Sequence, residues 1–268
     1  MPQLFAKDAR FNVQAILFDK DGTLMDFMYT WGYWADLLLS LYSRELEATE
    51  RSPRLMDVTA LWGLYRAPDG AIADYDRNGP FSMGTVGDIL TLLAWQGYRS
   101  GLSWAEAAVL ARQCSQAANE QLEQSRAARA VPDLVPFLEQ CRTIGLPLAV
   151  VTADETAAAE KHLQWLGLRR YFSAVIGNDQ VERGKPYPDM VELACRKLSV
   201  PAAQAAVIGD SNGDMLMAKS ADAAAAIGIT GPQDAGADHL PAADAVVSSY
   251  RELGFQDRFE NREVSMRK

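Results

Sequence analysis

Hydrophobic residues along the chain fall into short apolar runs that are separated by segments with helical spacing. The first run extends from Val13 to Phe18 with Gln14 as its one polar residue, which predicts a buried β-strand. Similar runs predict further strands at residues 147–151, 172–176, 205–208, 223–227 and 245–247, with helices that include 133–144 and 155–166. Because strands alternate with helices, the pattern predicts an α/β fold whose parallel sheet is covered on both faces.

Residues from about 27 to 130 carry helical signals only, and they separate the first strand from the rest of the sheet. Large apolar side chains recur at helical spacing within residues 29–46, and Pro53 can open a second helix. Thr85 and Ser103 can cap two more helices, because each is followed three residues later by a carboxylate. This segment therefore interrupts the sheet as a helical insertion.

The insertion predicts two domains. Residues 1–26 and 131–268 are expected to form a discontinuous α/β core, and residues 27–130 a helical cap domain. Residues 1–12 have a mixed pattern and are expected to be a loosely attached lead-in. Residues 67–84 are rich in Gly, Pro, Asp and Asn, which predicts a long loop of the kind that is often functional.

Composition and charge narrow the class of protein. The 268 residues are 49% hydrophobic and 23% charged, as is usual for globular proteins, and the net charge of -9 argues against a nucleic-acid partner. No stretch approaches the roughly 18 apolar residues of a membrane span, and no secretory signal is visible. Cys114, Cys141 and Cys195 fit neither a disulfide framework nor a zinc site. We therefore expect a cytoplasmic protein without membrane or nucleic-acid partners.

Polar side chains follow several of the predicted strands at the point where each strand ends. They are Asp19, Asp21, Thr152, Lys185, Asp210 and Asp214. The carboxyl ends of parallel strands lie at one edge of a sheet, so we expect these groups to meet there. Carboxylates are the ligands that Mg²⁺ prefers, and a lysine beside the metal adds a second positive charge. The pattern therefore predicts a magnesium-dependent phosphate site.

Four short motifs in chain order resemble those of the haloacid dehalogenase superfamily. They are Asp-Lys-Asp-Gly-Thr at residues 19–23, the strand-terminal Thr152, Gly-Lys-Pro at residues 184–186, and Gly-Asp-x-x-x-Asp at residues 209–214. The helical insertion after the first motif resembles the C1 cap of the phosphoglycolate-phosphatase-like branch. The resemblance implies a Rossmann-like core with a C1 cap, and a phosphatase that acts on a small phosphorylated metabolite such as phosphoglycolate.

The resemblance also implies a role for each residue. Asp19 would attack phosphorus and form an aspartyl-phosphate, and Asp21 would protonate the leaving alcohol and then activate water. The acid needs a protonated carboxyl group, and we expect neighbouring carboxylates to raise the pKa of Asp21. Thr152 and Lys185 would bind the phosphoryl oxygens. The ligands of Mg²⁺ would be Asp19, the backbone carbonyl of Asp21, Asp210 and, directly or through water, Asp214.

Structural roles remain open for some of these residues. Thr152 alone is typical of a helix N-cap, Lys185 alone of an exposed lysine, and Asp214 alone of a helix start. Asp154 and Asp189 are expected to start helices. The aromatic residues of the cap are assigned to its core, and His162 and His239 to structural roles. Lys20 is expected to point away from the metal.

Substrate recognition is expected to come from the cap. Arg66 and Arg77 could bind a substrate carboxylate or a second phosphate, although both are equally typical of surface arginines. Hinges at residues 25–28 and 129–132 are expected to let the cap open and close over the site.

Other activities share this fold, so the fold alone does not choose between them. Asp21 argues against a dehalogenase, which needs no proton for a leaving alcohol. The absence of lysine between Lys20 and Lys161 argues against a reaction through a Schiff base on the cap. A phosphosugar mutase or another phosphotransferase remains the alternative enzyme, and a catalytically silent binding protein the alternative from another class.

Overall fold

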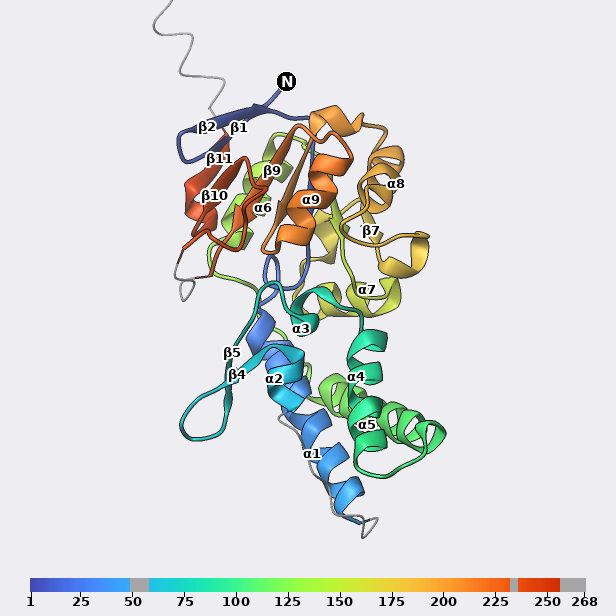
Figure 1. The fold of residues 1–268 in the computed structure, drawn as a ribbon. Helices are drawn as coiled ribbons and strands as arrows, with labels where there is room; N and C mark the ends of the chain where they lie inside the picture. Colours follow the sequence, from blue (N-terminus) through green and yellow to red (C-terminus); the bar gives the residue numbers. More distant parts are fainter. Residues whose placement is uncertain (49–57, 232–235, 256–268) are drawn as a thin grey trace, which may run out of the picture.

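The computed structural model describes residues 1–48, 58–231 and 236–255, which form a sheet-containing half and a mainly helical half (Figure 1). Within the described residues, the central sheet has six parallel strands in the order β10-β9-β8-β3-β6-β7. These strands are β3 (Ala15–Phe18), β6 (Leu148–Val151), β7 (Ala174–Ile176), β8 (Ala205–Gly209), β9 (Ala225–Ile229) and β10 (Ala245–Val247). The α/β fold expected from the apolar runs is thus confirmed.

Helices cover both faces of this sheet. They are α6 (Leu134–Thr143), α7 (Thr156–Trp165), α8 (Asp189–Leu198) and α9 (Asn212–Ser220), with 3₁₀ turns η2 (Arg169–Tyr171), η3 (Asn178–Gln180), η4 (Ala202–Gln204) and η5 (Tyr250–Glu252). Ile16 and Phe18 of β3 pack with α6 and α7, whereas Ala15 and Leu17 pack with α8 and α9. All four side chains are buried, which explains why β3 is a continuous apolar run.

A second sheet lies against the first, and it includes the N-terminal residues. It consists of β1 (Gln3–Ala6), β2 (Ala9–Asn12) and β11 (Leu253–Phe255), in the antiparallel order β11-β1-β2. Leu4 and Ala6 are buried in the same hydrophobic cluster as α6. The expected loose lead-in at residues 1–12 is therefore wrong. Two buried positions in a four-residue strand are too few for the periodicity to be recognised.

The insertion between β3 and α6 forms the other half of the molecule and has its own hydrophobic cluster (Figure 1). Its elements are the π-helical turn η1 (Met28–Gly32), α1 (Tyr33–Glu47), α2 (Val58–Trp62), β4 (Leu64–Arg66), β5 (Ile72–Tyr75), α3 (Pro80–Met83), α4 (Val86–Arg99) and α5 (Trp104–Ser125). Thr85 and Ser103 form the expected capping boxes of α4 and α5, with Asp88 and Glu106. We call residues 27–130 the insertion.

The insertion was expected to contain helices and a loop without strands, and this expectation is wrong. Tyr65 lies in β4, which pairs with β5 as an antiparallel hairpin. The expected loop at residues 67–84 contains β5 and the short helix α3. Strand pairing depends on residues about ten positions apart in this hairpin, so local periodicity cannot reveal it. The helix start expected at Pro53 lies outside the described residues.

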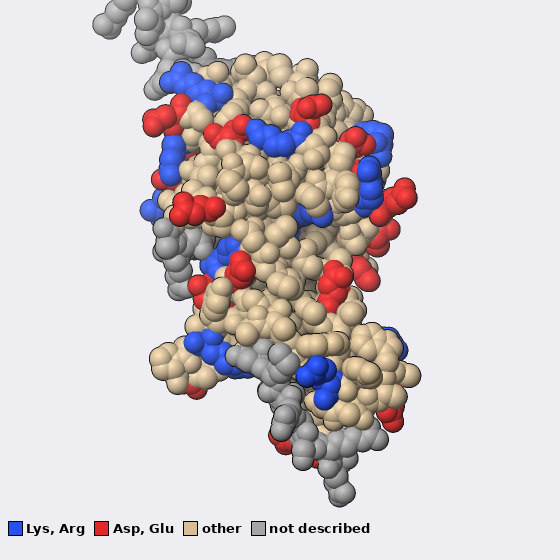
Figure 2. All heavy atoms as spheres, viewed as in Figure 1, with Lys and Arg blue, Asp and Glu red and all other residues tan. Residues whose placement is uncertain are grey.

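The distribution of charged side chains on the surface agrees with the net negative charge of the chain (Figure 2). On the face in Figure 2, lysine and arginine side chains are interspersed with aspartate and glutamate, without the basic stripe that nucleic acids require. Of the helices in the described ranges, none combines the length and the hydrophobicity that crossing a membrane requires.

Candidate active site

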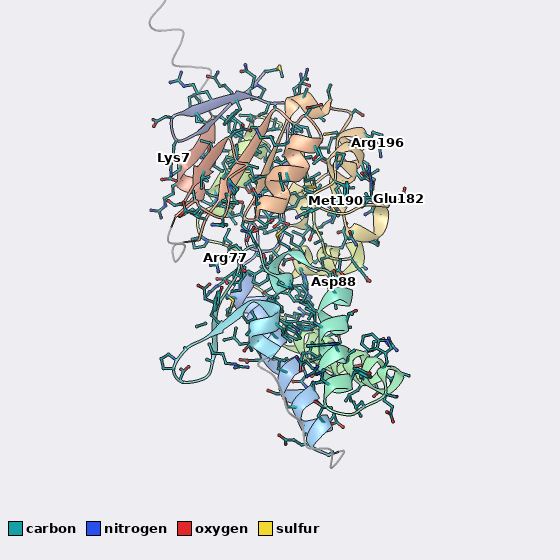
Figure 3. All side chains as sticks on the ribbon, in the orientation of Figure 1. Lys7, Arg77, Asp88, Glu182, Met190 and Arg196 are labelled. Atoms are coloured by element: carbon teal, nitrogen blue, oxygen red, sulfur yellow. The ribbon has the colours of Figure 1, made fainter. Side chains whose placement is uncertain are left out.

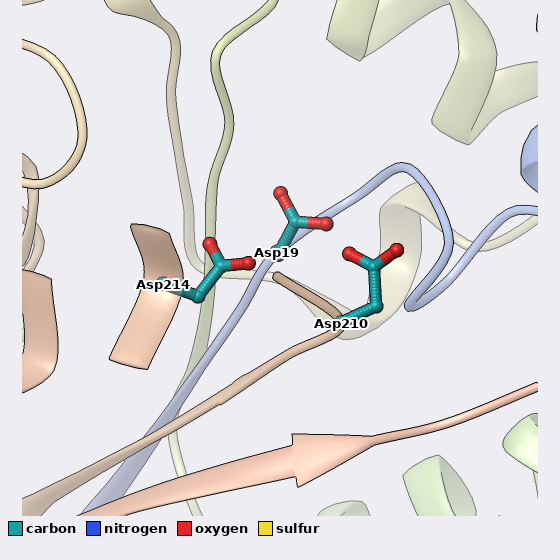
Figure 4. Close-up of side chains that lie close together, drawn as sticks. All are labelled: Asp19, Asp210 and Asp214. Carbon is teal, nitrogen blue, oxygen red and sulfur yellow. The ribbon is translucent and has the colours of Figure 1, made fainter. Parts of the chain in front are cut away.

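Three carboxylates meet at the carboxyl ends of β3 and β8. Asp19 follows β3, Asp210 follows β8, and Asp214 lies in the first turn of α9 (Figure 4). One oxygen from each group lies within 4.8 Å of the others. The two strands are adjacent with Phe18 opposite Ile208, and the Asp19 amide donates to the Ile208 carbonyl at 2.8 Å. The strand register therefore places Asp19 beside Asp210.

The site carries more negative than positive charge. Lys185, in the loop before α8, forms ion pairs with Asp19 and, at 2.6 Å, with Asp214. Burial raises the pKa of Asp19 to about 7 despite the nearby Lys185. Burial and the charges of Asp19 and Asp214 raise the pKa of Asp210 well above its usual range. Three carboxylates against one lysine need protons or a cation, and this oxygen-only set of ligands fits a divalent ion such as Mg²⁺.

Gly22 makes room for the cluster. Its φ angle of +83° is in the left-handed region, and a Cβ atom there would lie 2.0 Å from Oδ2 of Asp210. Any other residue would therefore displace a carboxylate of the cluster as well as strain the turn.

Asp214 has a structural role in addition to its place in the cluster. Its Oδ2 accepts hydrogen bonds from the Ser211 amide at 3.1 Å and from the Ser211 hydroxyl at 2.6 Å, which completes the capping box of α9. The same side chain is buried and contacts Lys185 through Oδ1. The alternative that Asp214 starts a helix is thus true, and it does not exclude a contact with a metal.

All six residues expected at the sheet edge line one small cavity. They are Asp19, Asp21, Thr152, Lys185, Asp210 and Asp214. Thr152 is buried and is not the N-cap of α7, which is Glu155. Lys185 has a side chain that is only 10% exposed, so it is not a surface lysine. The cavity has a volume of about 30 Å³, and α3 of the insertion covers it with Ser82 and Met83.

Asp21 lies in a different environment from Asp19, although only one residue separates them. Lys20 is fully buried, and its Nζ lies 2.8 Å from Oδ1 of Asp21 and 3.2 Å from Oδ2 of Asp154. The same Nζ is 3.0 Å from Nδ1 of His162, and the Trp31 indole donates to Oδ1 of Asp21 at 2.7 Å. We call these five residues the Lys20 network.

The Lys20 network corrects one expectation about Asp21. Burial alone would raise its pKa, but the positive charge of Lys20 and the hydrogen bonds from Lys20 and Trp31 hold the pKa below its usual value. The expectation that neighbouring carboxylates raise the pKa of Asp21 is therefore wrong, because the buried ammonium group of Lys20 pairs directly with Asp21. Burial also raises the pKa of Asp154 and lowers that of His162 to about 3.

Sequence reasoning missed the part that Trp31, Asp154 and His162 play at the site. The one available signal was Lys20 itself, since a lysine inside an apolar strand-to-turn segment needs an acidic partner. Asp154 does precede α7, as expected, with Oδ1 accepting from the Glu155 amide at 2.9 Å. Its partnership with Lys20 joins residues that are half of the chain apart, so local patterns could not predict it.

The two arginines of the insertion that were expected to bind substrate do not line this cavity. Arg66, on the exposed hairpin, donates to the Gly70 carbonyl and lies 3.8 Å from Asp36 of α1. Arg77 lies where the insertion meets the core (Figure 3), pairs with Asp74, and stacks over the Tyr75 ring at 3.8 Å. Contact of either arginine with a substrate stays a prediction.

A glycine substitution tests whether the space beside Asp210 is needed for metal binding. We expect Gly22→Ala to weaken Mg²⁺ binding by about tenfold or more, because the new Cβ displaces a carboxylate. Gly70→Ala is the matched control, since Gly70 also has a positive φ of +89° but no neighbour within 4 Å. Titration calorimetry measures both affinities. Equal losses in the two variants would contradict the prediction.

Metal binding should also depend on pH. Because the metal-free pKa of Asp19 is about 7, a proton competes with the metal below that pH. We expect the apparent affinity for Mg²⁺ to level off above neutral pH and to fall by up to about tenfold per unit below it. Calorimetry in buffers of different ionisation enthalpy measures the protons released. An affinity that is constant from about pH 5.5 to 8.5 would count against this site.

Removal of the Lys20 charge should destabilise the fold. Lys20→Met leaves Asp21 and Asp154 buried without their counter-ion, which is expected to cost about 3–5 kcal/mol in the free energy of unfolding. The double variant Lys20→Met/Asp154→Asn should recover part of that loss, whereas Lys197→Met, at an exposed lysine, should change little. Urea unfolding measures all three. A loss for Lys20→Met no larger than for Lys197→Met would show that the network is not a stabilising ion pair.

Comparisons with known proteins agree with this geometry. Residues 13–222 match the family model described as haloacid dehalogenase-like hydrolase. "Probable phosphatase IndB" of Dickeya dadantii is 42% identical over 99 residues, which cover 37% of this chain and 43% of that protein. "Phosphoglycolate phosphatase" of Escherichia coli is 36% identical over 90 residues, or 34% of this chain and 36% of that protein. The chain thus matches less than half the length of each relative.

A solved structure shares the fold over most of the chain. The crystal structure of a predicted phosphoglycolate phosphatase from Haemophilus somnus has a TM-score of 0.61 and 23% identity, and it covers 89% of this chain and 95% of that one. A putative β-phosphoglucomutase from Thermotoga maritima has a TM-score of 0.57 and 21% identity, with 87% and 94% covered. The family model spans most of the chain and includes all six predicted residues that line the small cavity, so the protein belongs to the haloacid dehalogenase-like hydrolases.

Proposed function

We propose that the protein is a Mg²⁺-dependent phosphatase that hydrolyses phosphate monoesters of a small metabolite. The observation that carries this proposal is that six residues from four separate motifs line one cavity. The curated relatives, which are named phosphatases, support the same reaction. We further propose that residues 27–130 form a cap domain and that residues 1–26 and 131–268 form the catalytic core.

Asp19 is the proposed nucleophile. Its carboxylate would attack phosphorus and form an aspartyl-phosphate, while the bond from phosphorus to the alcohol oxygen breaks. Asp19, Asp210, the Asp21 carbonyl and Asp214 would hold Mg²⁺, which when bound offsets the charge of the phosphoryl group. Lys185 and Thr152 face the same cavity and would bind the remaining phosphoryl oxygens.

Asp21 is the proposed acid and base. Its carboxyl group would give a proton to the leaving alcohol and later take one from the water that hydrolyses the aspartyl-phosphate. The Lys20 network keeps Asp21 ionised before substrate binds. A dianionic phosphate beside Asp21 raises the pKa of that group through like-charge repulsion, so substrate binding itself favours the protonated acid.

Movement of the insertion would open the site. Two chain crossings join the insertion to the core, and they are paired: the Asp26 amide donates to the Arg129 carbonyl at 2.8 Å, and the Val131 amide to the Leu24 carbonyl at 3.1 Å. We propose that hinges at residues 25–28 and 129–132 flex together, so that α3 covers or uncovers the cavity. The buried, unpaired state of all three cysteines supports a reducing, cytoplasmic setting for this enzyme.

Replacement of the nucleophile tests the reaction. Asp19→Asn is expected to abolish phosphate release from p-nitrophenyl phosphate, because the amide cannot form the phosphoenzyme, while the free energy of unfolding is not reduced. Asp8→Asn, at an exposed turn of the core, is the control and should keep full activity. The wild-type protein should lose activity with a chelator and regain it with Mg²⁺.

Each alternative has its own outcome in this experiment. Turnover that persists in Asp19→Asn would contradict the proposal that Asp19 is the nucleophile. Transfer of phosphate to a sugar acceptor without release to water would indicate a phosphotransferase. Metal-dependent binding of phosphate without any turnover by the wild-type protein would indicate a binding protein.

A further inference from the structure

A second, larger cavity lies between the insertion and the core beside the catalytic residues. Its volume is about 430 Å³, which is in the range of small-molecule sites. The walls come from both halves and include Trp31, Asn119 and Glu123 of the insertion and Lys161, His162 and Trp165 of α7. We call this space the interface cavity.

The interface cavity adjoins Asp21. Ala153 lines both this cavity and the small catalytic one. Trp31, which lines the interface cavity, donates its indole hydrogen bond to the carboxylate of Asp21. Because Asp21 is the proposed donor of a proton to the leaving alcohol, that alcohol must lie within reach of Asp21 while the phosphoryl group is at Asp19. The interface cavity is therefore the space that the rest of the alcohol can occupy.

The charges around the interface cavity disfavour a second anion. Among the described residues that line it, three are carboxylates: Glu123, Asp154 and Glu155. Lys161 is the one lysine or arginine in that lining, and it is paired with Glu123. Lys20 does not cancel this charge, because it is shared between Asp154 and Asp21, so a carboxylate or a second phosphate on the alcohol would meet an excess of negative charge without an arginine to bind it. An uncharged alcohol avoids this penalty.

Aromatic side chains form one wall. The ring centroids of Trp31 and His162 are 5.9 Å apart, and those of His162 and Trp165 are 5.1 Å apart, so the three rings form one aromatic cluster in the lining. Trp31 and Trp165 are only partly buried, although both pack against the hydrophobic cluster of the insertion. Burial lowers the pKa of His162 to about 3, which keeps the ring neutral near pH 7. Such a wall favours a flat or ring-shaped group.

Asn119, another residue that lines the interface cavity, is available for polar recognition. Asn119 on α5 accepts a hydrogen bond from the Trp34 indole at 2.7 Å through Oδ1, which fixes the orientation of its amide. The amide nitrogen of the same side chain is a donor, suited to the hydroxyl or carbonyl groups of a polar ring.

We propose that the interface cavity binds the leaving group and selects phosphate monoesters of neutral, ring-bearing alcohols, such as sugars or nucleosides, over small carboxylated esters. This inference rests on the proposed phosphatase function. In this proposal Trp31 and Trp165 recognise the ring of the substrate, whereas the sequence had suggested that Arg66 and Arg77 recognise a substrate anion.

A panel of four esters tests this selection. The alcohol part of phosphoglycolate is small and anionic, that of glycerol 3-phosphate is small and neutral, that of glucose 6-phosphate is a neutral sugar ring, and that of uridine 5′-phosphate adds an aromatic ring. We expect kcat/KM for one or both ring esters to exceed that for each small ester by about tenfold or more. Preference for the glucose or the uridine ester decides between a sugar and a nucleoside. A kcat/KM for phosphoglycolate equal to or above those for the ring esters would overturn the proposal.

A tryptophan substitution tests the aromatic wall. Trp165→Leu should raise KM for the preferred ring ester by about tenfold and leave glycerol 3-phosphate nearly unchanged. Trp104→Leu is the matched control, because Trp104 is 50% exposed at the start of α5 and lines neither cavity. Equal effects of Trp165→Leu on all four esters would overturn the role of the wall, and thermal unfolding would reveal a general loss of structure.

A glutamate substitution tests the charge. Glu123→Gln removes a carboxylate from the lining, so it should raise kcat/KM for phosphoglycolate by about threefold. Glu120→Gln, one turn earlier on α5 and exposed, should not. If kcat/KM for phosphoglycolate is unchanged in Glu123→Gln as well as in Glu120→Gln, the charge argument is overturned. This test does not depend on whether Trp165→Leu folds.

A binding measurement distinguishes failure of this inference from failure of the proposed function. If no ester is hydrolysed, the phosphatase proposal fails, but calorimetry with the same four esters on Asp19→Asn still ranks their affinities. A rank with the ring esters first supports the interface cavity as a ring-binding site. A rank with phosphoglycolate first overturns it.

Discussion

The excess of carboxylates at the ends of β3 and β8 is the constraint on which the rest of the site depends. Asp19, Asp210 and Asp214 are brought together by strand register and by the first turn of α9, and not by their own attraction, since like charges repel. The packing of the sheet must supply the free energy that holds them. The pair with Lys185 offsets only part of the repulsion, so protonation or a divalent cation is needed to complete the balance.

Two lysines divide the site into two electrostatic environments. Lys185 belongs to the carboxylate cluster, where burial still raises the pKa of Asp19. Lys20 belongs to the Lys20 network, where it lowers the pKa of Asp21. The two aspartates are separated by one residue, yet the chain leaves β3 and bends into a turn between them, so their side chains meet different partners. The proposed nucleophile, Asp19, and the proposed acid, Asp21, thus have different electrostatic environments within one short turn.

Local patterns sufficed for the parts of the fold that are decided locally. The apolar runs predicted the strands of the central sheet, and Thr85 and Ser103 marked helix starts that the capping boxes confirm. Chain order with the parallel-sheet rule was enough to predict that six polar residues meet at one edge. The N-terminal strand and the hairpin of the insertion were missed because each depends on a distant pairing. The environment of Asp21 was misjudged for the same reason, since His162 lies 142 positions from Lys20.

The insertion contributes differently to the two cavities, and this difference separates reaction from recognition. Over the small cavity at the carboxylate cluster, the insertion adds Ser82 and Met83 among the described residues, while the groups proposed to react all lie outside the insertion. Around the interface cavity it supplies Trp31 and residues of α4 and α5. Trp31 connects the two cavities, because it follows the proposed hinge, lines the interface cavity and donates to Asp21, which lines the small cavity. Opening at that hinge would remove the bond to Asp21 together with one wall of the interface cavity, so the acid has its closed-state environment only when the leaving group is enclosed.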